Sequence, residues 1–294
     1  MSSNTPTKTY LDRITPVNLA LPQLACDSHV HVFGPASRFP FAPQRNFTPA
    51  DAPKETLFDL HRQLGIERCI IVQSMVHGLD NSVVSDAIRA GGGRYLGVAL
   101  VAPDISLVQL RELATVGFRA VRFNFTAHLG SGIAPEALPE FTRKLAEVNL
   151  HLQVHFDGKL IHELSPWLSR SVVPVVIDHM ARVDATQGVG HADFQQLCRL
   201  LDSGRFHVKV SGIDRIDAHG VNRDTPYAHG IELARHLVSN FRERCVWGTD
   251  WPHPNHTHIP DDGLLVNALD IIAPSPEALR AILVDNPARL YRFD

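Results

Sequence analysis

Two histidines one residue apart, His29 and His31, occupy the short apolar segment Cys26-Asp-Ser-His-Val-His-Val-Phe-Gly-Pro35. Successive side chains of a β-strand point to opposite faces, so a strand here would place both imidazoles on the same side. Such a pair can bind a metal ion or polarise a carbonyl oxygen. Two histidines that simply alternate with valine on a half-exposed strand are the alternative. The choice depends on which residues accompany the pair.

Strand-like apolar segments alternate with helix-like amphipathic segments along most of the chain, a pattern that predicts parallel βαβ units. Strands are expected to begin near residues 26, 69, 96, 118, 150, 172, 206 and 245. Helices are expected at 54–64, 82–91, 106–116, 135–148, 159–169, 190–203, 228–241, 262–272 and 276–285. Eight units within about 250 residues predict a (β/α)8 TIM barrel of the α/β class.

The barrel is expected to be a single domain of residues 24–294, preceded by an extended Pro- and Thr-rich arm of residues 1–23. A doubly wound open sheet is the alternative fold. The first strand is not followed by a G-x-G-x-x-G turn, which disfavours dinucleotide binding.

The overall composition is that of an ordinary globular protein. The 294 residues are 44% hydrophobic and 20% charged, and the net charge is −3. Lysine and arginine form no basic stripe, which disfavours nucleic acid as a partner. The polar N-terminus does not have the pattern of a secretory signal, and no apolar run reaches the ~20 residues of a membrane span. The four cysteines are far apart. A cytoplasmic monomer or homodimer with no membrane partner is expected.

Polar and ionisable residues stand where most of the expected strands end. The active site of a TIM barrel lies at the C-terminal ends of its strands, so these side chains are expected to meet at one rim. The residues at this rim are His29 and His31, Ser74 and His77, Arg122 and Asn124, His155, His179, Arg215, Asp250 and His253.

Three of the histidines and one aspartate are predicted to form a metal site. His29, His31, His155 and Asp250 would supply three nitrogens and one carboxylate, a set that suits Zn²⁺, with Mn²⁺ as the second candidate. A bound ion lowers the pKa of its water to about 7. Asp250 could orient that water and take its proton, and His179 could act as acid, base or donor to a carbonyl oxygen. The alternatives are a core-lining role for His155 and a turn role for Asp250.

Two arginines are predicted to bind anionic groups of a substrate. The guanidinium groups of Arg122 and Arg215 can pair with carboxylates or sulfonates in a two-pronged geometry. Each alone could equally be a structural ion-pair residue. Because both follow rim strands, we predict that they contact the substrate, together with Ser74, His77, Asn124 and His253.

These motifs together resemble the amidohydrolase superfamily, and within it the 2-pyrone-4,6-dicarboxylate lactonases and 4-sulfomuconolactone hydrolases. The resemblance covers the chain from about Ala25 to Tyr291. It rests on the His-x-His segment, Val121-Arg-Phe-Asn-Phe125, Ile177-Asp-His179, Gly248-Thr-Asp-Trp-Pro-His-Pro254 and Asn286-Pro-Ala-Arg-Leu-Tyr291. It implies a hydrolase barrel that opens a lactone ring in the catabolism of aromatic compounds.

The sequence departs from the pyrone lactonase pattern in the substrate pocket. His155 and Phe47 each stand where that metal-independent enzyme has a tyrosine, and His128 stands where it has a further substrate-binding arginine. A histidine at position 155 is what metal-dependent relatives carry, and the sulfomuconolactone hydrolases are zinc-dependent. We therefore expect a metal-dependent hydrolase of a small anionic lactone, of the muconolactone or sulfomuconolactone type. The alternatives are a metal-free lactonase acting on pyrone dicarboxylate, a metal-dependent decarboxylase, and a ligand-binding barrel without turnover.

Overall fold

Eight parallel strands follow one another around a single sheet in the order of the chain. The computed structural model describes residues 6–126, 132–222 and 225–293. The strands are β1 (Cys26–Val30), β2 (Arg68–Val72), β3 (Tyr95–Leu100), β4 (Phe118–Phe125), β5 (His151–Phe156), β6 (Val175–Ile177), β7 (Phe206–Lys209) and β8 (Cys245–Val246). Backbone hydrogen bonds of 2.8 Å, from Ser28 N to Trp247 O and from Asp250 N to His29 O, connect the two ends of the sheet. The predicted TIM barrel is confirmed.

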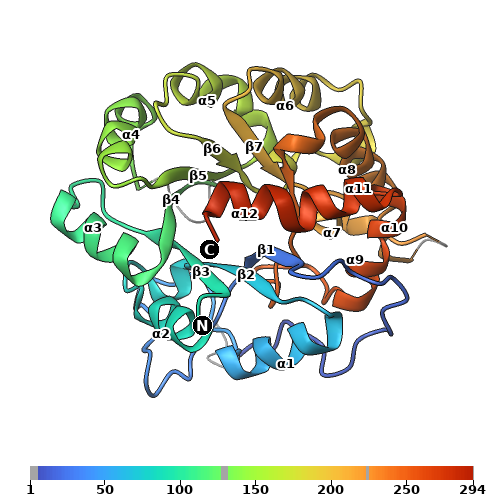
Figure 1. The fold of residues 1–294 in the computed structure, drawn as a ribbon, viewed down its shortest axis with the longest axis horizontal. Coiled ribbons are helices and arrows are strands. Elements are labelled where there is room, and N and C mark those ends of the chain that lie inside the picture. The colour runs from blue at the N-terminus through green and yellow to red at the C-terminus, as the bar shows by residue number, and fades with distance from the viewer. Residues whose placement is uncertain (1–5, 127–131, 223–224, 294) are drawn as a thin grey trace.

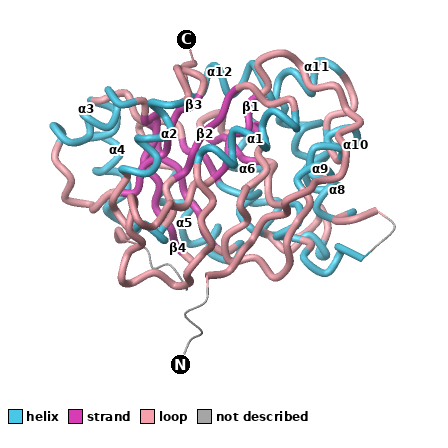
Figure 2. Tube along the Cα trace, turned by 90° about the horizontal axis from the view of Figure 1, so that it is seen from below, coloured by secondary structure: helices cyan, strands magenta, loops and turns pink. Residues whose placement is uncertain are grey.

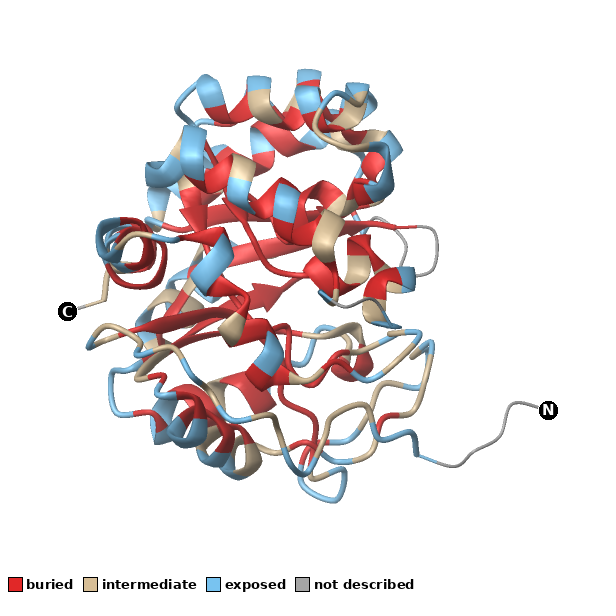
Figure 3. Ribbon diagram, turned by 90° about the vertical axis from the view of Figure 1, so that its right-hand side faces the viewer, coloured by how far each residue is buried: buried red, intermediate tan, exposed pale blue. Residues whose placement is uncertain are grey.

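Helices surround the strands, as Figure 1 shows. They are α1 (Lys54–Leu64), α2 (Ser82–Ala90), α3 (Leu107–Val116), α4 (Leu138–Glu147), α5 (Ile161–Leu168), α6 (Ala192–Asp202), α7 (Ile213–Ile216), α8 (Ala228–Phe241), α9 (Asp262–Asn267), α10 (Leu269–Ile272), α11 (Pro276–Arg280) and α12 (Asn286–Tyr291). Their local signals match the sequence: Ser106 and Gln109 form a capping box at the start of α3, and Gly65 ends α1 in a left-handed conformation. Figure 3 shows that the strands are buried and that the helices expose only their outer faces.

Two regions differ from the predicted elements. The strand expected from residue 172 to 179 is only three residues long, because Pro174 has no N–H and residues 179–182 adopt positive φ angles. The helix expected at 262–272 is divided into α9 and α10, the α-helix expected at 276–285 ends at Arg280, and α12 lies beyond the expected range. A π-helical turn (Ala281–Asp285) joins α11 to α12, where Pro287 has no N–H to donate to the preceding turn.

The interior of the barrel changes from apolar to polar along its axis. At the amino-terminal end, Leu290 and Tyr291 of α12 pack against an inner cluster that includes Ile70, Val98 and Val176. Further along the same inward faces lie the polar side chains of Arg122, Asn124, Gln153, His155 and Lys209. Figure 2 shows that many of the loops gather at the end of the barrel opposite α12. The strand periodicity therefore delivers polar groups to the carboxyl end, as predicted.

The segment before β1 lies along the loops at this carboxyl end. Thr15 N donates to Asp261 Oδ1 over 3.0 Å, and Asn18 N donates to Asn267 Oδ1 over 2.8 Å. The ring of Tyr10 lies 5.2 Å from that of Trp251. No helix in the described ranges is long and apolar enough to cross a membrane.

Candidate active site

Asp27 fixes the first strand to the turn that follows the last strand. Its buried carboxylate accepts hydrogen bonds from His29 N (3.1 Å), Thr249 N (3.1 Å) and Thr249 Oγ1 (2.6 Å). The pairing of β1 with β2 shifts register between Asp27 and Val30, and His29 reaches the interior there. Gly248 allows this close approach, since a Cβ atom there would lie 2.5 Å from His29 N. The backbone thus brings His29 and Asp250 together.

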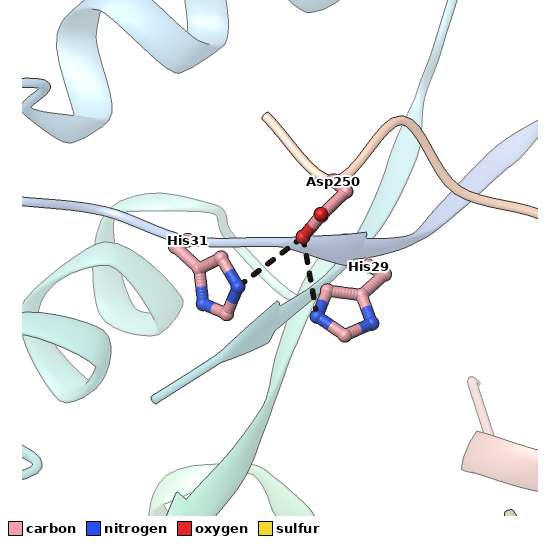
Figure 4. Close-up of side chains that lie close together, drawn as sticks. All are labelled: His29, His31 and Asp250. Carbon is pink, nitrogen blue, oxygen red and sulfur yellow. Dashed lines mark ion pairs between the residues drawn. The ribbon is translucent and has the colours of Figure 1, made fainter. Parts of the chain in front are cut away.

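Three imidazoles converge on one carboxylate oxygen. The Nε2 atoms of His31, His29 and His179 lie 3.3, 3.6 and 3.8 Å from Asp250 Oδ1. Figure 4 shows His29, on β1, and His31, directly after that strand, facing Asp250. All four side chains are buried. His29, His31, His179 and Asp250 thus form a cluster of nitrogen and oxygen atoms at the centre of the barrel rim, which we call the focus.

The tautomer of His31 follows from its second neighbour. Its Nδ1 atom lies 2.7 Å from the carbonyl oxygen of Val72, which can only accept, so Nδ1 carries a proton. In neutral His31 the Nε2 lone pair then faces the lone pairs of Asp250 Oδ1. Two such acceptors 3.3 Å apart require a positive charge between them, either a proton on His31 or a metal ion.

Burial keeps three other histidines of the site, His29, His155 and His179, neutral. Burial, assisted by the Lys209 ammonium, lowers the pKa of His29 to about 3. Burial also holds the pKa values of His155 and His179 well below the usual range. Burial alone would raise the pKa of Asp250, but the Arg215 guanidinium and the three neighbouring imidazoles together keep that pKa well below its usual range. At neutral pH Asp250 is thus ionised, and His29, His155 and His179 are neutral.

A strained turn after β6 presents His179. Residues His179 to Arg182 have φ angles of 48°, 52°, 58° and 50° in succession, which costs about 1–2 kcal/mol for each non-glycine residue. His179 Nδ1 lies 2.9 Å from Ser211 Oγ, which fixes the ring. A Cβ atom at Gly212 would lie 3.0 Å from that of His179, so glycine permits this packing. Strain of this kind is typical of functional sites.

Three arginines line the pocket above the focus. Arg122 Nε lies 2.9 Å from Asp178 Oδ2, and Arg215 contacts Asp250 Oδ2 through Nε and Pro254 O through a terminal nitrogen. Arg182, which the sequence analysis did not select, is partly exposed at the pocket wall. The remaining lining residues are His31, Asn46, Ser74, Met75, Asn124, His155, His179, Asp250, Pro254 and Asn255.

Not every residue predicted for the site reaches this focus. His155 lines the pocket, but its Nδ1 contacts Asn124 Oδ1 at 3.3 Å, and none of the possible metal-ligand groups among the described residues includes it. His77 uses both ring nitrogens to hold the loop after β1, through Gly34 N and Pro40 O. His253 is fully buried, 3.1 Å from Asp262. His77 and His253 are absent from the pocket lining.

Three further positions were predicted to contact the substrate. Ser74 and Asn124 line the pocket. His128 lies outside the described residues.

Two buried charges beneath the pocket were not among the predicted site residues: Asp178 was placed at a strand end without a role, and Lys209 was not selected. Asp178 lies next to His179 and binds Arg122, and Lys209 on β7 lies 3.5 Å from Asp178 Oδ1 and 3.4 Å from His29 Nδ1. Burial lowers the pKa of Lys209 to about 8. The sequence did contain a signal, because Lys209 is a charged residue inside an apolar strand. Side chains alternate between the two faces of a strand, so Lys209 lies on the same face as His207.

The focus fits a divalent metal ion. His29 Nε2 and Asp250 Oδ1 are buried and have no hydrogen-bond partner among the residues that the structure describes. Ligand atoms around a tetrahedral zinc ion are separated by roughly 3.3 Å, close to the 3.3 and 3.6 Å between Asp250 Oδ1 and the two imidazoles. His29, His31 and Asp250 could therefore hold an ion. The predicted fourth ligand, His155, is outside this group, whereas His179 is close to the same oxygen.

This fold and site define a class of proteins to which the chain belongs. Residues 26–293 match the model of the Amidohydrolase family. The chain is 40% identical to a 2-pyrone-4,6-dicarboxylate hydrolase of Comamonas testosteroni, over 92% of this chain and 91% of that protein. It is also 40% identical to a 4-sulfomuconolactone hydrolase of Hydrogenophaga intermedia, over 95% and 92%. The protein is therefore a member of the amidohydrolase family.

A solved structure supports the same relationship. A probable 2-pyrone-4,6-dicarboxylic acid hydrolase from Acinetobacter baumannii, with citric acid bound, aligns with a TM-score of 0.79 and 25% identity. The alignment covers 92% of this chain and all of that one.

Proposed function

We propose that this protein is a lactone hydrolase that opens the ring of a small anionic lactone, of the pyrone-dicarboxylate or sulfomuconolactone type, in aromatic catabolism. The observation that carries the proposal is the Oδ1 atom of Asp250. Within the described part of the chain this buried carboxylate oxygen has no hydrogen-bond partner, and it faces three imidazoles at the base of a pocket lined by arginines. Two 40% identical relatives are named as hydrolases of such substrates, and the Acinetobacter relative holds citric acid, a small polyanion.

The arrangement suits the addition of water to an acyl carbon. Asp250 Oδ1 takes a proton from the attacking water, while His179 Nε2 can donate to the ring carbonyl oxygen as it gains negative charge. The acyl carbon–oxygen bond of the ring then breaks. Asp250 returns the proton to the departing ring oxygen, so one water is consumed, and the new carboxylic acid becomes a carboxylate by releasing the second water proton to solvent. The arginines bind the acidic groups of the substrate and orient its ring toward Asp250.

A divalent ion would add to this chemistry, with Zn²⁺ proposed before Mn²⁺. His29, His31 and Asp250 would hold it, and it would act as a Lewis acid toward the lactone carbonyl. The proposal rests on His29 Nε2 and Asp250 Oδ1, which have no hydrogen-bond partner among the described residues. It also rests on the Nε2 lone pair of His31, which is directed at Asp250 Oδ1.

A metal-free lactonase is the second candidate, and two contacts favour it. Arg215 already neutralises Asp250, and Lys209 Nζ lies within 3.4 Å of His29 Nδ1. In that case protonated His31 and the Nε2–H of His29 would polarise the carbonyl. Decarboxylation and binding without turnover are less well supported, because the two relatives described above are named as hydrolases.

The proposal is tested with purified protein and two substrates. 2-Pyrone-4,6-dicarboxylate and 4-sulfomuconolactone are each incubated with the protein, and loss of the ring is followed by ultraviolet absorbance. Metal content is measured on protein purified without chelators, and turnover is repeated after chelation and after addition of Zn²⁺ or Mn²⁺. Ring opening of at least one substrate is expected. Failure on both, or release of CO2 instead of ring opening, contradicts the proposal. Full activity in metal-free protein would select the second candidate.

A further inference from the structure

A buried ammonium group lies directly behind His29. Lys209 is the last residue of β7, and its side chain is fully buried. Its Nζ atom lies 3.4 Å from His29 Nδ1 and 3.5 Å from Asp178 Oδ1. These are the polar contacts of this ammonium within residues 6–126, 132–222 and 225–293. A fully buried lysine is costly, so its place beside an active-site histidine calls for a functional explanation.

Asp178 does not need Lys209 as its counter-ion. Its Oδ2 atom lies 2.9 Å from Arg122 Nε and accepts a hydrogen bond of 3.1 Å from Gln153 Nε2. Its Oδ1 atom faces both His29 Nδ1, at 3.4 Å, and Lys209 Nζ. Arg122 alone balances the charge of Asp178, so the positive charge of Lys209 is surplus to that pair. Lys209 is thus a second cation beside Asp178, and its ammonium also lies within reach of His29 Nδ1, at 3.4 Å.

The Nδ1 atom of His29 has two mutually exclusive hydrogen bonds. As a donor to Asp178 it leaves the Nε2 lone pair directed at Asp250, which is the arrangement that binds a metal ion. As an acceptor from Lys209 it places the proton on Nε2, which then points toward Asp250 Oδ1 as a donor. An Nε2–H group cannot bind a metal ion. The partner chosen by Nδ1 thus decides what His29 offers to the active site.

We propose that Lys209 is a positioning residue that weakens metal binding at this site: its ammonium donates to His29 Nδ1 and keeps the proton on Nε2. Its fixed positive charge acts in the same direction, because it repels a divalent cation held by His29. The proposal rests on the proposed function for the role of the cluster as the reaction centre. It explains how one set of residues can serve either metal-dependent or metal-free lactone hydrolysis.

The test compares the Zn²⁺ affinity of the metal-free wild-type protein with that of Lys209→Met, by competition with a chromogenic chelator at constant pH and ionic strength. Methionine keeps the length of the side chain and removes its charge and donors. Tightening of about 10–100-fold is expected, the usual size of an effect from residues behind a metal ligand. Lys209→Arg retains a donor and a charge and should keep the weak affinity. Lys159→Met, at an exposed position, is the matched control and should change nothing.

A second measurement needs no variant. Nitrogen-15 NMR of the histidine side chains in the metal-free wild type should show His29 protonated at Nε2, and Lys209→Met should move the proton to Nδ1. A wild-type His29 protonated at Nδ1 overturns the proposal, as does a Lys209→Met protein with unchanged or weaker Zn²⁺ affinity. Neither readout uses a substrate, so failure of lactone hydrolysis and failure of this inference are recognised separately.

Discussion

The Nε2 atom of the His31 imidazole and the Oδ1 atom of the Asp250 carboxylate, both hydrogen-bond acceptors, face each other. The Nδ1 proton of His31 is committed to a backbone carbonyl, and its Nε2 atom lies 3.3 Å from Asp250 Oδ1. Only a proton or a metal ion between them makes this arrangement favourable. Asp250 faces this positive charge through Oδ1 and contacts Arg215 through Oδ2. The metal binding and the base catalysis proposed above would therefore both depend on this pair.

Replacement of Asp250 should remove most of the activity. The variant Asp250→Asn keeps the shape of the side chain but has little capacity to accept a proton, so kcat should fall by about 10²–10⁴-fold. Steady-state kinetics on whichever of the two candidate lactones is hydrolysed measure this effect. The exposed residue Asp270 provides the matched control, since Asp270→Asn should retain wild-type kcat. A kcat within threefold of wild type in Asp250→Asn would remove Asp250 from the mechanism.

Arg182 should contribute to the binding of the anionic groups of the substrate. Its side chain is partly exposed at the pocket wall, and its distance of 3.9 Å from Asp157 is long for an ion pair. The variant Arg182→Gln should raise KM about tenfold, the value of one charge-assisted hydrogen bond, with little change in kcat. Arg111→Gln, on the exposed face of α3, serves as control. An unchanged KM for a dianionic lactone would show that Arg182 does not contact it.

The close approach of β1 to the turn after β8 should not tolerate a side chain at position 248. In Gly248→Ala the new Cβ would lie 2.5 Å from His29 N and 2.9 Å from His29 Cβ. Relief of this clash must displace His29 from Asp250, so both activity and stability should fall, the latter by about 1–3 kcal/mol. Urea denaturation and kinetics measure the two effects. Gly190→Ala meets open space and should have neither. Equal behaviour of the two variants would contradict the predicted clash.

Stability should fall in mildly acidic solution because buried histidines must gain protons on unfolding. Burial, with the nearby Arg244 and Arg289, lowers the pKa of His207 to about 4 in the folded protein, against about 6.5 when unfolded. The unfolded chain binds the extra proton, so stability is retained above pH 6.5 and is lost as pH falls toward 4. The loss is about 1.4 kcal/mol per pH unit for this residue. Urea denaturation between pH 7 and 4.5 measures it, and His207→Gln should give a shallower dependence. An unchanged slope in that variant would contradict the assignment.

The sequence by itself determined the alternation of elements and the chemistry available at each strand end. Alternation along a strand depends only on backbone geometry, so the inward placement of Arg122, Asn124 and His155 could be read directly from the chain. The same rule would have placed Lys209 inside the barrel, but it is silent on what an inward-facing residue contacts.

The tertiary structure decided which of these groups meet. Asp250 reaches His29 because hydrogen bonds to Asp27 join the first strand to the turn after the last one. His155 lies on β5, away from that junction around the barrel, and contacts Asn124 on the neighbouring strand. His179 reaches Asp250 only through a run of left-handed residues that no periodic pattern announces. Distances across a barrel depend on its closure and on long-range hydrogen bonds, whereas sequence patterns report only local geometry.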